Sequence, residues 1–218
     1  MKGSFFVMAV LVAAICVSPT LGYPTSCAFI PTADVMEPGT IRMELENDGY
    51  PSIGRTGSVS YSLNQFGLTP KLEFGVDRYD FSGEPQDSLN VKYLLLKESD
   101  AKPAVALGLM DVAEGVNQTY YAVGTRTFGG LRLHAGYIHA DYARSPMLGC
   151  DQDLGRDTYL LADWIGGSEN YLALGLYREF NKSWAVTFFY GFANPGGEDN
   201  LAGISLSRTW SFSGLAAR

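Results

Sequence analysis

The chain has 218 residues, with 16 lysines and arginines against 23 aspartates and glutamates, which gives a formal net charge of −7. An acidic chain without a basic cluster argues against nucleic-acid binding. No stretch after the N-terminal region approaches 18 continuous apolar residues, so no transmembrane helix is expected. The length suits one ordinary domain, and no linker interrupts it, so residues 23–218 are predicted to form a single domain.

The N-terminus is predicted to be a secretory signal peptide, residues 1–22. Lys2 precedes the apolar run FFVMAVLVAAICV, which is too short to span a bilayer as a helix. Small residues around Gly22 favour cleavage after that residue. A lipoprotein signal at Cys16 is disfavoured because Ile15 stands where a small residue is required. The sequence therefore predicts an exported protein.

Eleven segments of alternating polarity follow, and each is predicted to be a β-strand. In GTIRMELEN, for example, Ile41, Met43 and Leu45 share one face of the strand. The opposite face carries Arg42 and Glu44. The predicted strands lie near residues 39–47, 57–65, 69–79, 88–98, 103–112, 117–127, 130–140, 157–166, 170–180, 183–192 and 200–210.

These strands predict an all-β fold, an antiparallel up-and-down transmembrane β-barrel of 10–12 strands. One face of each strand is apolar, and strands of about 9–11 residues suit a tilted crossing of a bilayer. Aromatic residues gather toward the strand ends, as in an interfacial girdle. They are Tyr79, Phe81, Tyr142, Trp164, Trp184, Tyr190, Phe192, Trp210 and Phe212. The predicted location is the outer membrane, with its lipid around the barrel.

Two details of the strand pattern conflict with this topology. Single-chain bacterial barrels favour even strand numbers, and CAFIPTAD, near residues 27–34, is the best candidate for a missing strand. Strict alternation also places the short turn at 180–183 on the outer side, where loops are usually long. Either one strand is uncounted between residues 140 and 180, or that outer loop is short.

The polar faces of the strands bring charges of both signs into the barrel lumen. Such residues usually pair into a network that fills a small barrel, so a closed, plugged barrel is favoured over an open pore. No cofactor is expected. The lumen-facing candidates are Arg42, Glu44, Lys71, Glu73, Asp77, Lys92, Arg126, Arg132, His134, Asp163 and Glu179.

The only two histidines, His134 and His139, lie five residues apart on one predicted strand. Their rings therefore point to opposite sides of the sheet and cannot share a metal ion, and no metal site is expected. His134 is predicted to face the lumen beside Arg132 as a hydrogen-bonded wall residue. The alternative is a lipid-modifying barrel enzyme with His134 as its base. No serine lies two positions from His134, and no catalytic residue is assigned.

Two further patterns bear on binding sites. CDQDLGRD, residues 150–157, has acidic spacings that a calcium loop could use, but Gly155 comes one position early and the closing glutamate is absent. An ordinary solvated acidic loop is favoured there. Cys27 and Cys150 remain after the signal peptide, and either a disulfide or two unpaired thiols would fit an exported protein.

Several stretches carry a resemblance to a known family. They include GTIRMELE, LTPKLEFGVDRYDF, NVKYLLLKES, PAVALGLMDV, YYAVGTRTFGGLRLHAGY and ADWIGGSENYLALGLYREFNKSW, in this order between residues 37 and 192. The chain resembles the short bacterial outer-membrane β-barrels related to YjbH, a family associated with exopolysaccharide biosynthesis. The resemblance implies a structural or transport role with envelope polysaccharide or its secretion proteins as partners. It implies no catalytic residues.

A third class of function remains open from the alternation alone. A soluble periplasmic β-barrel or sandwich would turn the same strands inside out and bind an apolar ligand within the apolar face.

Overall fold

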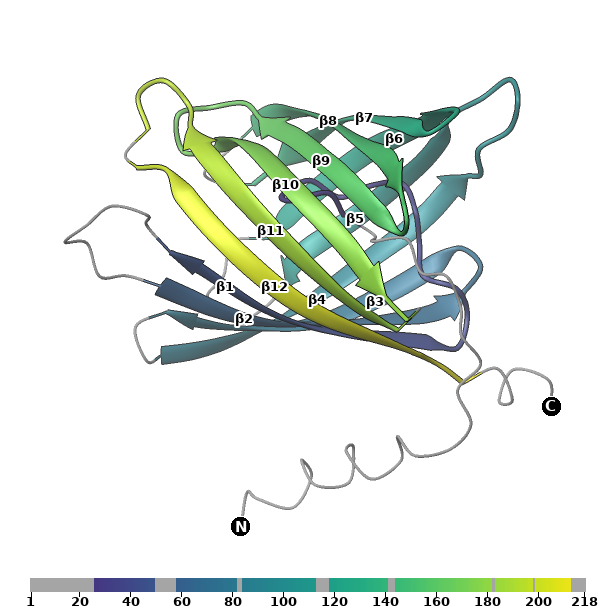
Figure 1. The fold of residues 1–218 in the computed structure, drawn as a ribbon, viewed down its shortest axis with the longest axis horizontal. Coiled ribbons are helices and arrows are strands. Elements are labelled where there is room, and N and C mark those ends of the chain that lie inside the picture. The colour runs from purple at the N-terminus through teal and green to yellow at the C-terminus, as the bar shows by residue number, and fades with distance from the viewer. Residues whose placement is uncertain are drawn as a thin grey trace, which may run out of the picture.

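The computed structural model describes residues 26–49, 58–81, 84–112, 118–140, 144–181, 183–197 and 199–212. It is a closed barrel of twelve antiparallel strands, in which each strand pairs with its neighbours in the sequence (Figure 1). The predicted all-β barrel is confirmed. The predicted signal peptide, residues 1–22, and the alternative lipid site at Cys16 lie outside the described residues.

The strands run from 8 to 13 residues in length. They are β1 (Thr40–Gly49), β2 (Ser58–Thr69), β3 (Leu72–Phe81), β4 (Glu84–Leu96), β5 (Ala104–Val112), β6 (Thr119–Phe128), β7 (Leu131–His139), β8 (Arg144–Gly155), β9 (Thr158–Ile165), β10 (Tyr171–Phe180), β11 (Trp184–Ala193) and β12 (Leu201–Ser211). The barrel closes where β1 pairs with β12, from Thr40 opposite Ser211 to Gly49 opposite Ala202. This closure pairs the edges that would otherwise aggregate.

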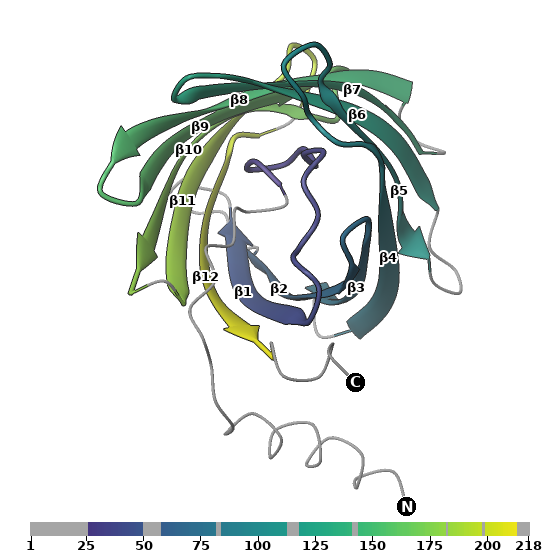
Figure 2. The ribbon, with the colours of Figure 1, turned by 90° about the vertical axis from the view of Figure 1, so that its right-hand side faces the viewer.

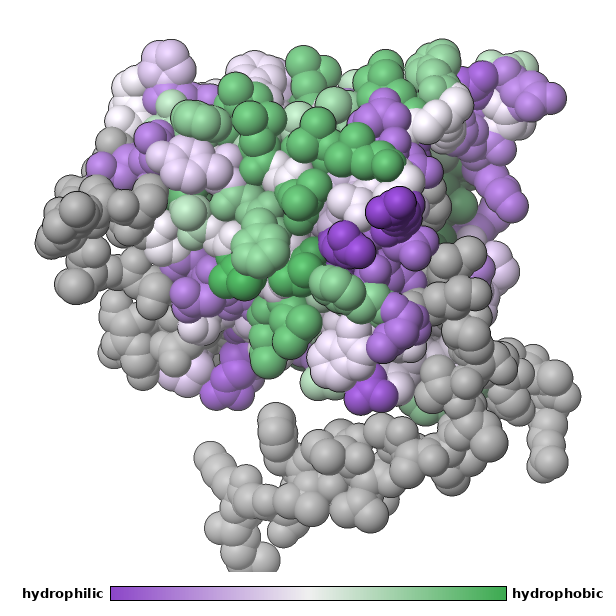
Figure 3. Space-filling view, viewed as in Figure 1, coloured by the Kyte–Doolittle hydropathy of each residue, from purple (hydrophilic) through white to green (hydrophobic). Residues whose placement is uncertain are grey.

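The alternation along each strand sorts side chains between the lumen and the outer surface. On β1, Arg42 and Asp48 are buried, whereas Leu45 is 63% exposed. Hydrophobic side chains cover much of the outer face over β9–β12 (Figure 3). The hypothesis of an inside-out soluble barrel is wrong, because the apolar faces point outward. Among the described residues, we find no helix that is long and apolar enough to cross a membrane.

The strand missing from the sequence-based count is β8, Arg144–Gly155. The prediction of a strand at 27–34 and that of an acidic loop at 150–157 are both wrong. Residues 150–155 pair with β7 and β9, and the chain turns at Arg156 and Asp157, which have φ of 55° and 56°. Positive φ at both central residues is the geometry of a tight two-residue hairpin. With β8 counted, the short turn before β11 lies at the same end as the turns β2–β3, β6–β7 and β8–β9.

Residues 26–39, which we call the plug, lie inside the barrel, where the purple segment occupies the ring of strands (Figure 2). Ile30 and Ala33 of the plug are fully buried. The plug returns to the wall at its C-terminal end, where the Gly39 N–H donates to the Gly67 carbonyl over 2.9 Å. A Cβ at Gly67 would lie 1.9 Å from the Glu37 carbonyl oxygen, so only glycine allows this approach.

One side of the lumen contains a small apolar core that includes the plug. Cys27, Ile30 and Ala33 of the plug pack with inward-facing side chains of β4 to β8. The wall contributes Leu94, Ala104, Ala106, Tyr121, Val123, Ile138 and Met147 to this cluster. Burying Ile30 alone contributes about 1.5–3 kcal/mol to holding the plug inside.

Candidate functional site

Three wall side chains accept hydrogen bonds from the backbone of the plug. The Phe29 N–H donates to Asp163 Oδ2 on β9 over 2.9 Å. The Ala33 N–H donates to Thr125 Oγ1 on β6, and the Met36 N–H to Glu73 Oε2 on β3, each over 2.9 Å. The plug has almost no regular structure of its own, so these wall acceptors satisfy N–H groups that would otherwise be buried without a partner.

Two wall cations hold the plug at Asp34. Lys92 on β4 donates from Nζ to the Asp34 carbonyl oxygen over 3.0 Å, and its ammonium also lies 3.6 Å from Glu73 Oε1. Arg132 on β7 forms an ion pair with the Asp34 carboxylate. Anchors from β3, β4, β6, β7 and β9 therefore surround the plug, and no sheet pairing joins its residues 29–36 to the described wall.

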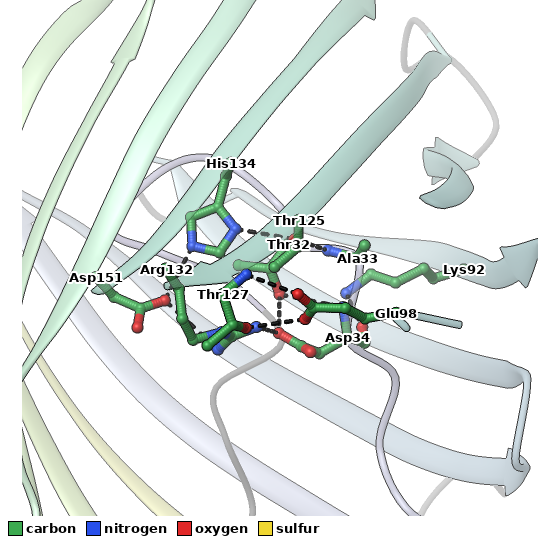
Figure 4. A network of polar contacts seen from close by, with 10 residues as sticks. All are labelled: Thr32, Ala33, Asp34, Lys92, Glu98, Thr125, Thr127, Arg132, His134 and Asp151. Atoms are coloured by element: carbon green, nitrogen blue, oxygen red, sulfur yellow. Dashed lines mark hydrogen bonds and ion pairs between the residues drawn. The ribbon is translucent and has the colours of Figure 1, made fainter. Parts of the chain in front are cut away.

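Arg132 belongs to a buried polar chain that continues along the wall (Figure 4). Its Nη1 lies 3.4 Å from Asp151 Oδ2, and the same oxygen lies 2.9 Å from His134 Nε2. The other ring nitrogen, His134 Nδ1, lies 2.9 Å from Thr125 Oγ1. The barrel register sets both contacts, because His134 is opposite Thr125 and Arg132 is opposite Asp151.

The order hydroxyl, imidazole, carboxylate is also that of hydrolases with a nucleophile and a general base. Thr125 is only 1% exposed, however, and its oxygen accepts the Ala33 N–H of the plug. A lipid acyl group therefore has no approach to this hydroxyl while the plug is in place. The contacts identify His134 as a hydrogen-bonded wall residue, and the lipid-modifying alternative gains no accessible nucleophile at this position.

Cys27 of the plug lies against this polar chain. Its sulfur, a ring nitrogen of His134 and a carboxylate oxygen of Asp151 lie within 4.8 Å of one another, and all three residues are buried. Burial raises the pKa of the Cys27 thiol well above its usual range, with further contributions from the Asp163 and Asp151 carboxylates. The sequence did not predict this group, because its members come from three separate elements.

Of the two alternatives left open for Cys27 and Cys150, the structure has the two free thiols. Cys150 lies on β8 between Gly149 and Asp151. Asp151 is buried in the lumen, and a Cβ at Gly149 would point at Ile30 of the plug, 2.6 Å from its Cδ1 atom. Because neighbouring residues of a strand face opposite sides, Cys150 faces away from the lumen and from Cys27.

A cavity of about 200 Å³ lies in the lumen beside the plug. Its lining includes Cys27 and Phe29 from the plug and Tyr177 from β10. Four of the acidic side chains that line it are Glu44, Glu46, Glu73 and Asp77, and the basic ones are Arg42 and Lys92. Arg42 Nη2 pairs with Glu44 Oε2 over 2.7 Å. Acidic groups therefore outnumber basic groups around this space.

The structure places most of the predicted lumen residues inside the barrel. Buried positions are Arg42, Glu73, Asp77, Lys92, Arg132, His134 and Asp163, and partly buried ones are Glu44 and Glu179. Two placements are wrong. Lys71 lies in the exposed turn between β2 and β3. Arg126 lies on the outward face of β6, where it donates to the carbonyls of Ser99, Asp100 and Lys102 in the β4–β5 connection.

Sequence reasoning missed three residues that the site needs. Asp34 was assigned to a strand, and Asp151 to a loop. Thr125 was passed over in favour of its charged neighbour Arg126. The inward alternation Thr119, Tyr121, Val123, Thr125 along β6 is a signal that could have identified it.

Comparisons with known proteins place the fold. No family model matches the sequence, and no curated protein matches it. The KdgM porin is similar in structure, with TM-score 0.58 at 9% sequence identity over 78% of this chain and 99% of that chain. The KdgM porin in complex with disordered oligogalacturonate gives TM-score 0.57 at the same identity and coverage. The chain therefore has the fold of outer-membrane porins, and the resemblance to YjbH-related barrels stays a sequence-based prediction.

Proposed function

We propose that this protein is an outer-membrane barrel of transport type whose lumen is closed by the plug, residues 26–39. The observation that carries the proposal is the way the plug is held. Its backbone N–H groups donate to Asp163, Thr125 and Glu73, which anchor it inside a polar lumen. These bonds, the ion pair of Asp34 with Arg132 and the burial of Ile30 involve none of the backbone hydrogen bonds between wall strands, so the plug can leave its place without breaking the sheet of the barrel.

The charges around the cavity favour small cations over anions. Four acidic side chains line it, Glu44, Glu46, Glu73 and Asp77, against two basic ones, Arg42 and Lys92. A low-dielectric channel lined by one sign of charge concentrates ions of the opposite sign. The KdgM porin has been solved with oligogalacturonate, an acidic saccharide. This acidic lumen favours a different class of solute.

The resemblance to YjbH-related barrels supports a second cargo, envelope polysaccharide, with polysaccharide-secretion proteins as partners. A saccharide chain exceeds a cavity of about 200 Å³, so this cargo also requires the plug to leave the lumen. Both cargoes require the plug to leave the lumen, and they differ in whether a small cation or a polysaccharide chain then passes.

The test is conductance across a planar lipid bilayer. The full chain is compared with a variant that lacks residues 26–36, and both are first checked for a gel band that shifts on boiling. We expect rare openings from the full chain and sustained openings from the variant, with a reversal potential in a KCl gradient that reports cation preference. Conductance about tenfold higher or more is expected, because a twelve-stranded barrel without its filling has room for water.

Two results would contradict the proposal. A folded variant that stays closed would identify a structural barrel rather than a transporter. Anion preference in the open variant would remove the assignment of cationic solutes and favour acidic polysaccharide as the cargo.

A further inference from the structure

The geometry points to a binding site for a zinc-type metal ion, formed by Cys27, His134 and Asp151, that joins the plug to the barrel wall. Cys27 belongs to the plug, His134 to β7 and Asp151 to β8. A metal ion bound by all three would therefore cross-link a removable segment to two fixed strands. The site itself depends only on the position of the plug, and its effect on gating rests on the proposed transport function.

The separations between the three ligand atoms suit a tetrahedral ion after small adjustments. Zinc bound to sulfur, nitrogen and oxygen keeps these atoms about 3.4–3.6 Å apart. Here they all lie within 4.8 Å of one another, and His134 Nε2 already lies 2.9 Å from Asp151 Oδ2. The largest separation needs to close by about 1 Å, which side-chain rotation can supply.

The second nitrogen of His134 already has the partner that a metal-bound imidazole needs. When Nε2 binds the ion, the ring proton moves to Nδ1, which then donates to Thr125 Oγ1, 2.9 Å away. Such an outer partner fixes the orientation of the ring in most histidine-metal sites. Cys27 releases its thiol proton to water as the sulfur becomes a thiolate ligand.

The wall also offers a carboxylate oxygen at this position as a ligand. Asp151 Oδ1 is buried and has no hydrogen-bond partner among the residues that the structure describes. The thiolate and the Asp151 carboxylate would neutralise a divalent ion, so burial would leave no net charge at the site. The neighbouring Arg132 keeps its pair with Asp34.

The donor set selects the ion. One sulfur, one imidazole nitrogen and one carboxylate oxygen fit zinc and other borderline metals, whereas calcium and magnesium bind oxygen ligands. The ion also has a route to the site, because Cys27 lines the lumen cavity. Three protein ligands leave a fourth position for water from that cavity.

The chain offers a matched control for two of these ligands. Cys150 faces away from the lumen, and His139 lies exposed on the outward face of the same strand as His134. The experiment uses the full folded chain in detergent and measures Zn²⁺ bound per chain by competition with a chromogenic chelator. The variants are Cys27→Ser, His134→Gln, Cys150→Ser and His139→Gln, each checked for its heat-modifiable gel band.

We expect one Zn²⁺ per chain for the parent protein and for the Cys150→Ser and His139→Gln controls. Cys27→Ser and His134→Gln should bind at least about 100-fold more weakly, since the loss of even an outer partner costs about 10–100-fold. Ca²⁺ should not compete. Equal binding by the parent and Cys27→Ser, or no binding by the parent, would overturn the site.

A second measurement covers the case in which the ligand variants do not fold. Co²⁺ added to the parent chain, and to the Cys150→Ser control, should give the near-ultraviolet absorption of a cobalt–thiolate bond. Its absence from the folded protein would overturn the site. The effect of Zn²⁺ on gating is measured in a separate experiment. Zn²⁺ should reduce channel openings of the parent, and zinc binding without any conductance would retain the site while removing the transport function.

Discussion

The two sides of the barrel lumen are filled in different ways. On the side of β4 to β8, apolar side chains such as Val123 and Met147 pack against Ile30 of the plug. On the opposite side, the apolar cluster is smaller and contains no plug residue: Leu161, Tyr177 and Ala185 of β9 to β11 pack together with Tyr159. There Arg42, Glu44 and Tyr177 border a cavity instead.

The difference shows where closure and passage would reside. A well-packed side holds the plug through burial and a buried polar chain, and its contacts have little tolerance for change. The side with the cavity keeps charged groups next to open space, where charge affects which solute enters. Substitutions on the first side should therefore change stability and gating, and those on the second side should change selectivity.

Loss of Arg132, on the packed side of the lumen, should have the largest effect on stability. Arg132→Met leaves the carboxylates of Asp34 and Asp151 without their cation partner in a buried setting. We expect the free energy of unfolding to fall by about 3–5 kcal/mol. Urea-induced unfolding of the reconstituted barrel, followed by tryptophan fluorescence, measures this change.

Arg78→Met is the matched control. Arg78 lies 3.6 Å from Asp87, and the two side chains are 54% and 67% exposed. Removing this surface pair should change the free energy of unfolding by less than about 1 kcal/mol. Similar losses for the two variants would show that the Arg132 network does not hold the packed side together.

Gly149→Ala should have an intermediate effect, on the docking of the plug. Its new Cβ would lie 2.6 Å from Ile30 Cδ1, in a region with no free space. Overpacking of this kind costs about 1–3 kcal/mol. A loss of about 1.4 kcal/mol in docking raises the undocked population about tenfold.

Alkylation of Cys27 by a maleimide, in a Cys150→Ser background, reports that population. In the docked state Cys27 should react more slowly than a free cysteine at pH 8, because burial hides the thiol and its raised pKa lowers the thiolate fraction. The rate should rise with pH, and Gly149→Ala should increase it about tenfold. Gly124→Ala, where a Cβ lies no closer than 3.6 Å to its neighbours, is the control. Equal rates in the two variants would contradict tight packing of Ile30 against β8.

Glu46→Gln, on the side of the cavity, should have the smallest effect on stability and should act on ion selectivity instead. It removes one of the acidic side chains that face the cavity from β1. We expect the free energy of unfolding to change by no more than about 0.5 kcal/mol. The reversal potential of the chain without residues 26–36 should shift toward lower cation preference. Asp157→Asn, in the exposed β8–β9 turn, should leave the potential unchanged.

The sequence predicted most strands because the alternation of apolar and polar side chains dominates their pattern. Apolar side chains such as Leu45, Leu174 and Leu206 point outward, so a strict alternation marks each wall strand. β8 departs from that rule. Its inward side carries the apolar Met147, which packs with Ile30 of the plug inside the barrel, and its outward side carries Pro146.

The plug and its site could not be predicted by the same means. Residues 26–39 follow no secondary-structure period, because the surrounding wall specifies their path through Asp163, Thr125 and Glu73. The group of Cys27, His134 and Asp151 depends on that path as well. Alternation did place His134 in the lumen, but it could not indicate which residue would lie opposite its ring.

The sequence separation of the plug contacts has a consequence for the order of folding. Phe29 and Ala33 bond to residues that lie 134 and 92 positions further along the chain. These acceptors reach their places only after β6 and β9 have joined the sheet, and contacts of such long range form late. The plug, which is the earliest described segment to be synthesised, is therefore among the last to reach its native position. A docked plug indicates that the wall strands around it have already assembled.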